Sequence, residues 1–146
     1  LKLISDGDIT GALLVSNEKY GVDIFMGIGG GPEGVLAASA LDAYNCNFQG
    51  RFIFEEENDI YRAKKMGIKE LDRKYELSEI ISGDSIFCAT GITSGDLVKG
   101  IKLIDDKYSS ETLVTHKNSN TKKVIKRTEN LTSWFQSLIK YGVKGK

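Results

Sequence analysis

The sequence has few of the residues that build thiol or metal frameworks. Its 146 residues include two cysteines, Cys46 and Cys88, and one histidine. A structural zinc site uses four Cys or His ligands, so this composition argues strongly against one. Both cysteines lie in apolar stretches typical of strands or helices. We therefore expect reduced core cysteines, as is usual in a cytoplasmic protein.

Excess charge and long apolar runs are also missing. Twenty Lys and Arg residues balance twenty Asp and Glu residues, which gives no support to nucleic acid or an anionic membrane as the main partner. No apolar run approaches the roughly 18 residues of a membrane-spanning helix, and no signal peptide is visible. Apolar residues make up 40% of the chain, so we expect one soluble, cytoplasmic globular domain with a sizeable core.

The chain has a single proline, Pro32, which lies inside the densest run of glycines. Residues 27–34 read Gly-Ile-Gly-Gly-Gly-Pro-Glu-Gly. A strand-type apolar run at 22–26 precedes them, and an Ala- and Leu-rich stretch at 35–44 predicts a helix after them. A glycine-rich turn into a helix N-terminus offers bare N–H groups and a positive dipole to a phosphate.

The carboxylate of Glu33 lies within this candidate phosphate-binding turn. In its ordinary role, a carboxylate in the first turn complements the helix dipole and contributes roughly 0.3–1 kcal/mol. Beside a bound phosphate it would repel the ligand unless a cation lay between them. Since Mg²⁺ and Mn²⁺ are held by one or two carboxylates together with phosphate oxygens, metal ligation by Glu33 is the alternative.

Strand-type and helix-type segments alternate along the first half of the chain, which predicts βαβ units with parallel pairing. We expect an α/β fold with three α/β/α layers and a mixed sheet. A hairpin around residues 118–120 adds the antiparallel part. The expected strands are residues 1–4, 22–26, 48–54, 85–89, 113–116 and 122–127, and the expected helices are residues 9–15, 35–44 and 58–66.

Three polar or glycine-rich loops follow expected strands, at residues 6–8, 27–34 and 90–96. Ligands of open α/β sheets bind at the carboxyl ends of strands, so parallel strands would bring these loops to one crevice. Asp6 and Asp8 could accept hydrogen bonds from sugar hydroxyls or bind a cation. A plain turn with a helix cap is the alternative for both.

A dinucleotide-binding fingerprint competes with the phosphate-and-metal hypothesis. Gly29, Gly31 and Gly34 satisfy G-x-G-x-x-G, and Glu55 follows about twenty residues later. Pro32 and Glu33 disfavour this alternative, because one removes a donor and the other adds negative charge at the pyrophosphate seat. A third possibility is a non-enzymatic domain that only docks on a partner.

Several motifs in order along the chain resemble the class II (GlpX-type) bacterial fructose-1,6-bisphosphatases. They are Ser-Asp-Gly-Asp at 5–8, the glycine loop with Val-Leu-Ala-Ala at 27–38, Gln-Gly-Arg at 49–51, Ala-Lys-Lys-Met-Gly at 63–67, Phe-Cys-Ala-Thr-Gly-Ile-Thr at 87–93, Gly-Asp-Leu at 95–97 and Glu-Thr-Leu at 111–113. The resemblance implies the C-terminal domain of the sugar phosphatase, or lithium-sensitive phosphatase, fold over residues 1–130.

The same resemblance implies an activity and a set of site residues. The family removes the 1-phosphate of fructose 1,6-bisphosphate, giving fructose 6-phosphate in gluconeogenesis, and uses Mn²⁺ or Mg²⁺. Its sugar-phosphate contacts map to Asp6, Gly7, Asp8 and Gly30, and its metal ligand maps to Glu33.

The family's other metal ligands, and the residue that positions its attacking water, belong to an N-terminal domain that is absent here. We therefore expect no catalytic residue in this segment, and no activity from it alone. Since the chain opens at Leu1 within an apolar run, we expect a piece of a longer protein whose partners are its own N-terminal domain and further copies of itself.

The last segment, residues 131–146, lies beyond the motifs that carry the resemblance. Its apolar side chains recur at helical spacing, which predicts an amphipathic helix followed by a frayed tail. These side chains are Leu131, Trp134, Phe135, Leu138 and Ile139.

Overall fold

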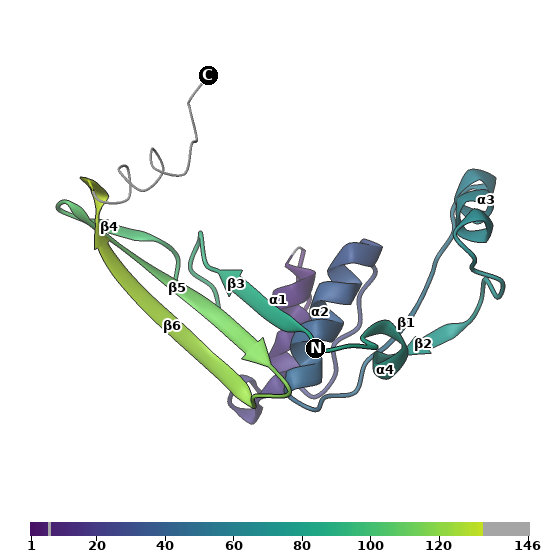
Figure 1. The fold of residues 1–146 in the computed structure, drawn as a ribbon, viewed down its shortest axis with the longest axis horizontal. Helices are drawn as coiled ribbons and strands as arrows, with labels where there is room; N and C mark the ends of the chain where they lie inside the picture. Colours follow the sequence, from purple (N-terminus) through teal and green to yellow (C-terminus); the bar gives the residue numbers. More distant parts are fainter. Residues whose placement is uncertain (6, 133–146) are drawn as a thin grey trace, which may run out of the picture. The chain divides into compact units, whose positions relative to one another are not determined.

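The computed structural model describes residues 1–5 and 7–132, and the chain divides into two units, Leu1–Ser85 and Ile86–Lys146. Helices and strands both occur (Figure 1), so the chain is α/β in the broad sense. Asp6 and the expected helix after residue 132 lie outside the described residues.

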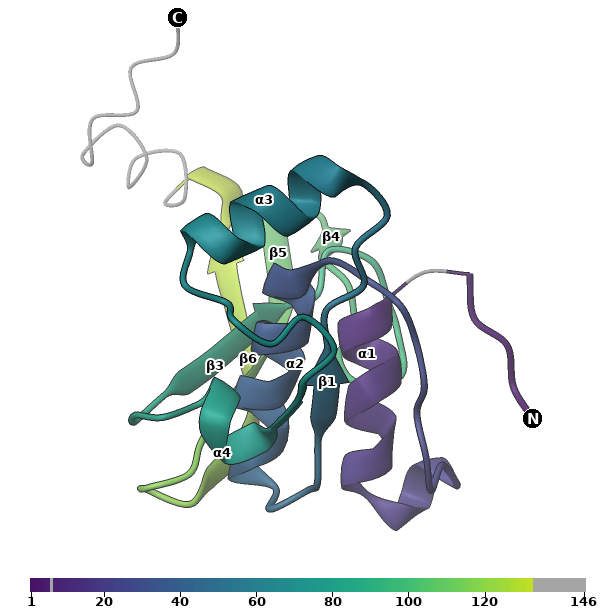
Figure 2. The same cartoon turned by 90° about the vertical axis from the view of Figure 1, so that its right-hand side faces the viewer.

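Two packed helices form the core of the first unit. They are α1 (Asp8–Leu13), which continues into the 3-10 turns η1 (Leu14–Ser16) and η2 (Glu18–Tyr20), and α2 (Gly31–Ala43). Figure 2 shows them side by side. Their contact is built from small and aliphatic side chains, since Leu13, Ala38 and Leu41 are buried. The predicted helix after the glycine loop is confirmed, and it begins earlier, with Pro32 in its first turn.

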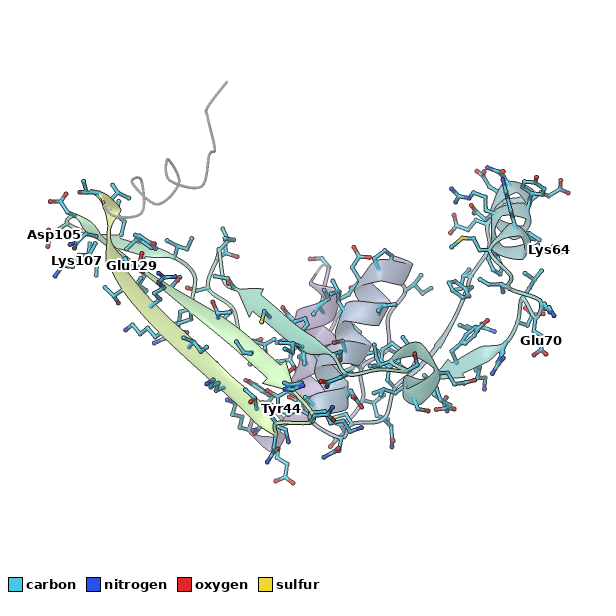
Figure 3. The ribbon with its side chains drawn as sticks, in the orientation of Figure 1. Tyr44, Lys64, Glu70, Asp105, Lys107 and Glu129 are labelled. Carbon is cyan, nitrogen blue, oxygen red and sulfur yellow. The ribbon has the colours of Figure 1, made fainter. Side chains whose placement is uncertain are left out.

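The rest of the first unit is a small hairpin-like pair with two helices. β1 (Gln49–Arg51) pairs antiparallel with β2 (Lys74–Glu76), between which lies α3 (Glu57–Lys65); α4 (Leu77–Ile80) follows. Acidic residues occupy the first turn of α3 and lysines its last, as the helix dipole favours. Figure 3 shows Lys64 on α3 and Glu70 in the connection to β2.

The second unit is a four-stranded antiparallel sheet around one long strand. β5 (Lys107–His116) pairs along its whole length with β6 (Thr121–Asn130). β3 (Ile86–Thr90) and β4 (Lys102–Ile104) pair with opposite ends of β5. The predicted hairpin is confirmed and is longer than expected, and its turn is closed by the Asn120 N–H, which donates to the Lys117 carbonyl at 2.9 Å.

Parallel pairing, expected for the first half of the chain, is a wrong prediction for the described residues: every strand pair among them is antiparallel. Residues 1–4 and 22–26 have the side chains of strands but are not in strands. A strand needs a neighbour to take its N–H and C=O groups, which local pattern cannot supply. The three-layer arrangement and the lithium-sensitive phosphatase fold stay predictions.

Residues 22–28 are covered unevenly, since Val22 and Phe25 are half-buried and the others are exposed. Phe25 and Ile4 lie against α1 at Gly11, where a built Cβ would come within 2.6 Å of either side chain. Ile24, Met26 and Ile28 are exposed. Gly11 is therefore needed for the close approach of two apolar side chains, and the segment presents a second, bare apolar side.

Cys46 and Cys88 are both free thiols. Cys46 is half-buried, whereas Cys88 in β3 is exposed, so the prediction of a core position is wrong for Cys88. Alternation along β3 explains this, because Phe87 takes the buried side. Among the described residues, no helix has the length and apolar character required to span a bilayer.

Candidate functional site

The candidate site lies where the loop before α1 meets the loop before α2, within the first unit. Gly7 precedes α1 in the left-handed conformation, with φ 79° and ψ 41°, which glycine adopts without the penalty of a side chain. The Gly11 N–H donates to the Gly7 carbonyl at 2.8 Å and closes the first turn. This geometry sets the direction in which Asp8, the first residue of α1, leaves the turn.

Asp8 lies directly against the glycine loop. A Cβ built on Gly29 would collide with the Asp8 carboxylate, so Gly29 leaves the space in which that carboxylate lies. From the sequence, Gly29 had a role of its own only in the competing dinucleotide fingerprint, and was otherwise one of several loop glycines. Gly29 lies next to Asp8 because α1 packs on α2. No local sequence motif encodes that packing.

Glu33 lies against the next glycine. Gly30 is the N-cap of α2 and has no side chain to cap it, and a built Cβ there would collide with the Glu33 carboxylate. The Glu33 side chain thus folds back over the turn that precedes its own helix. Gly29 and Gly30 are consecutive, so the structure brings the carboxylates of Asp8 and Glu33 to one short piece of exposed backbone.

The donor set of this site suits a hard cation. Carboxylate oxygens are the preferred protein ligands of Mg²⁺ and Mn²⁺, and neither carboxylate has a hydrogen-bond or ion-pair partner within residues 1–5 and 7–132. Two carboxylates do not make a full coordination shell. No cluster of three or more His, Cys, Asp or Glu residues that could hold a metal occurs in the described part of the chain.

Of the predicted substrate contacts, Gly7, Asp8 and Gly30 lie at this site, together with the predicted metal ligand Glu33. Asp6 lies outside the described residues. The third predicted loop, residues 90–96, belongs to the second unit, so its convergence with the other two stays a prediction. There Glu111 fixes the loop, because its carboxylate accepts the Lys99 N–H at 2.8 Å.

The dinucleotide fingerprint fits this geometry poorly. Its third glycine allows close helix–strand packing, yet a Cβ built on Gly34 meets nothing within 4 Å, and the same is true of Gly31. The residues before the loop form no strand, and Glu55 follows β1 outside any described strand. The crowded glycines are Gly29 and Gly30, and what crowds them is carboxylate.

Comparison with known proteins also favours a bisphosphatase over a dinucleotide-binding protein. The family model described as bacterial fructose-1,6-bisphosphatase, glpX-encoded, matches residues 1–129. A D-fructose 1,6-bisphosphatase class 2/sedoheptulose 1,7-bisphosphatase of Synechococcus sp. (strain JA-3-3Ab) is 37% identical over 138 residues, which covers 86% of this chain and 40% of that protein. The proteins of the same description from Acaryochloris marina and Thermosynechococcus vestitus are each 32% identical, over 94% and 97% of this chain.

The chain spans between 40% and 45% of the length of these three relatives. Residues 130–146 lie beyond the match to the family model. The match includes both loops of the candidate site, with Gly7, Asp8, Gly30 and Glu33 inside it. The chain belongs to the family of glpX-encoded bacterial fructose-1,6-bisphosphatases.

Proposed function

We propose that this chain is the C-terminal part of a metal-dependent sugar bisphosphatase that hydrolyses the 1-phosphate of fructose 1,6-bisphosphate. The relatives are named as fructose 1,6-bisphosphatases and sedoheptulose 1,7-bisphosphatases, which supports this activity and adds sedoheptulose 1,7-bisphosphate as a second proposed substrate. The observation that carries the proposal is the meeting of Asp8 and Glu33 at Gly29 and Gly30. Two carboxylates that have no partner among the described residues, beside bare backbone, suit a site shared by a cation and a sugar phosphate.

Each residue of the candidate site has a proposed role that follows from its chemistry. A divalent ion bound at Glu33 would activate water and neutralise charge on the phosphoryl group. Gly30 allows Glu33 to fold back, and its exposed backbone lets a ligand approach closely. Asp6 and Asp8, on either side of Gly7, would accept hydrogen bonds from the sugar. Mn²⁺ or Mg²⁺ is the proposed metal, and gluconeogenesis in the cytoplasm is the proposed setting of the parent.

The remaining ligands and the groups that position water are proposed to come from an N-terminal domain of the parent chain. The apolar side of residues 22–28 supports such a partner, since Ile24, Met26 and Ile28 are exposed and apolar patches on soluble proteins mark interaction sites. A homo-oligomer of the parent is the further expectation from the family resemblance.

Assays of the parent and of this chain alone test the proposal. The parent is expected to release phosphate from fructose 1,6-bisphosphate only with Mn²⁺ or Mg²⁺ and to show no affinity for NAD. The 146-residue chain is expected to release none, because its site holds too few ligands for the ion. Metal-dependent turnover by the chain alone, or NAD binding by the parent, would contradict the assignment.

A neighbouring pair of glycines gives a finer prediction. In the parent, Gly30→Ala places a methyl group where the Glu33 carboxylate lies. Disturbing the surroundings of a metal ligand costs about 10–100-fold in affinity or activity, and we expect the metal concentration for half-maximal activity to rise about tenfold or more.

Gly31→Ala is the matched control for that prediction. Its Cβ meets nothing within 4 Å, so activity and metal dependence should stay at the parent's level. Equal behaviour of the two variants in a Mn²⁺ titration would show that the Glu33 carboxylate does not need the space at Gly30.

A further inference from the structure

One aromatic side chain lies between the two loops of the candidate site. Phe25 belongs to the segment that leads into the glycine loop, which Figure 2 shows running alongside α1. A Cβ built on Gly11 of α1 would lie 2.6 Å from Cε2 of the Phe25 ring, and a Cβ built on Gly27 of the loop would lie 3.1 Å from its Cζ. The half-buried ring therefore fills the space between α1 and the loop.

The contacts of this ring are close because both of its neighbours are glycines. A residue without a side chain lets another group approach its backbone directly, and at Gly11 any side chain would overlap the ring. Folded proteins fill such spaces tightly and collapse in part when a side chain is shortened. A smaller side chain at position 25 would therefore let α1 and the loop shift toward each other.

The first turn of α1 meets the glycine loop a second time, at Asp8. The Asp8 carboxylate lies in the space that Gly29 leaves. Asp8 and Gly11 belong to the same turn, which the Gly11 N–H closes by donating to the Gly7 carbonyl at 2.8 Å. Three helical residues rise only about 4.5 Å, so a shift of Gly11 against Phe25 would carry Asp8 with it.

The position of the Asp8 carboxylate depends on this packing. Within residues 1–5 and 7–132 the carboxylate has no hydrogen-bond or ion-pair partner. What places it is the turn that carries it and the space at Gly29. Its position is therefore sensitive to the separation of α1 from the loop, and the ring of Phe25 sets that separation.

We propose that Phe25 is a positioning residue for sugar binding, because its ring holds α1 and the glycine loop at the separation that directs the Asp8 carboxylate to the sugar. This inference rests on the proposed function, in which Asp8 accepts hydrogen bonds from the sugar. Glu33 is placed differently, since it folds back over Gly30 at the start of its own helix. Phe25 should therefore affect the binding of the substrate and leave the binding of the metal unchanged.

Phe25→Leu in the full-length parent tests the inference. Leucine keeps an apolar side chain against α1 but lacks the ring that also reaches Gly27. The KM for fructose 1,6-bisphosphate is expected to rise about tenfold, since a misplacement of about 1 Å can cost about 100-fold. The Mn²⁺ concentration for half-maximal activity should stay at the parent's level.

Phe54→Leu is the matched control for this variant. Phe54 is also a half-buried phenylalanine of the first unit, and its ring stacks on Phe52 in the segment between β1 and α3. Both variants lose one aromatic ring, so a general loss of packing would affect them alike. The control should lower stability and leave the KM unchanged.

A double-mutant cycle with Asp8→Asn shows whether Phe25 acts through Asp8. Asp8→Asn alone is expected to raise the KM about tenfold or more, because hydrogen bonds to a charged acceptor are the stronger ones. Effects of independent residues multiply, whereas here Phe25→Leu should add less than about twofold to the KM of Asp8→Asn. Gly29→Ala places a methyl group where the Asp8 carboxylate lies and should raise the KM as Phe25→Leu does, with the ring intact.

Two outcomes would overturn the inference while the unaltered parent is active. One is a KM in Phe25→Leu or in Gly29→Ala equal to that of the parent. The other is a cycle in which the effects of Phe25→Leu and Asp8→Asn multiply, since Phe25 would then act independently of Asp8. An unaltered parent that releases no phosphate from fructose 1,6-bisphosphate would instead refute the proposed function, and with it the role of Asp8.

Discussion

Replacing Glu33 by Gln in the full-length parent is expected to lower metal-dependent phosphate release at least about 100-fold. Outer partners of metal ligands are already worth about 10–100-fold, and a ligand that contacts the ion directly should be worth no less. Glutamine keeps the size of the side chain and its fit over Gly30 but removes the charge. The loss should therefore appear in kcat and in the metal requirement while the fold is retained.

The same variant separates the two roles that a first-turn carboxylate can have. If Glu33 only complements the dipole of α2, its replacement costs roughly 0.3–1 kcal/mol of stability and leaves turnover intact. The measurement is a Mn²⁺ titration of activity beside a urea unfolding curve. Glu18→Gln is the control, because Glu18 is an exposed first-turn residue of η2 away from the glycine loop. A fully active Glu33→Gln enzyme would refute the metal assignment.

Local chemistry was sufficient to predict the parts of the fold that depend on neighbours in sequence. The helix after the glycine loop, the charge order of α3 and the hairpin of β5 and β6 each follow from propensity, dipole or turn residues. The strands expected at residues 1–4 and 22–26 do not, because a strand is completed by a partner distant in sequence. Their side chains fit a strand, and no described backbone pairs with them.

In the candidate site too, contacts between sequence neighbours could be predicted and contacts that depend on tertiary packing could not. Gly30 and Glu33 are three residues apart at a helix start, so their meeting could be anticipated from the motif. Asp8 and Gly29 meet because α1 packs on α2. That packing is a tertiary fact, and sequence reasoning had left Gly29 to a competing dinucleotide motif. The family resemblance supplied what neither periodicity nor spacing contains, namely which ligand the two loops serve.

Gly100→Ala is expected to destabilise the second unit by about 1–3 kcal/mol, the usual cost of overpacking a filled site. A Cβ at Gly100 would lie 2.6 Å from the Thr93 carbonyl carbon and 2.7 Å from the Ile92 oxygen and the Ser94 nitrogen. All three are backbone atoms, which cannot swing aside as a side chain can. The two backbone segments of the loop, residues 92–94 and 100–101, would have to separate instead.

That separation would weaken specific hydrogen bonds of the loop. The effect of Gly100→Ala can therefore be measured locally, at the residues that form these bonds. The Gly100 N–H donates to the Ser94 hydroxyl at 3.0 Å, and the Ile101 N–H donates to the Ile92 carbonyl at 3.1 Å. Hydrogen exchange at Ile101 should therefore accelerate before the sheet unfolds. Gly95→Ala is the control, since its Cβ meets nothing within 4 Å, and it should be neutral or stabilise slightly. Unchanged Ile101 exchange in Gly100→Ala would mean that this loop is held elsewhere, with Glu111 as the remaining anchor.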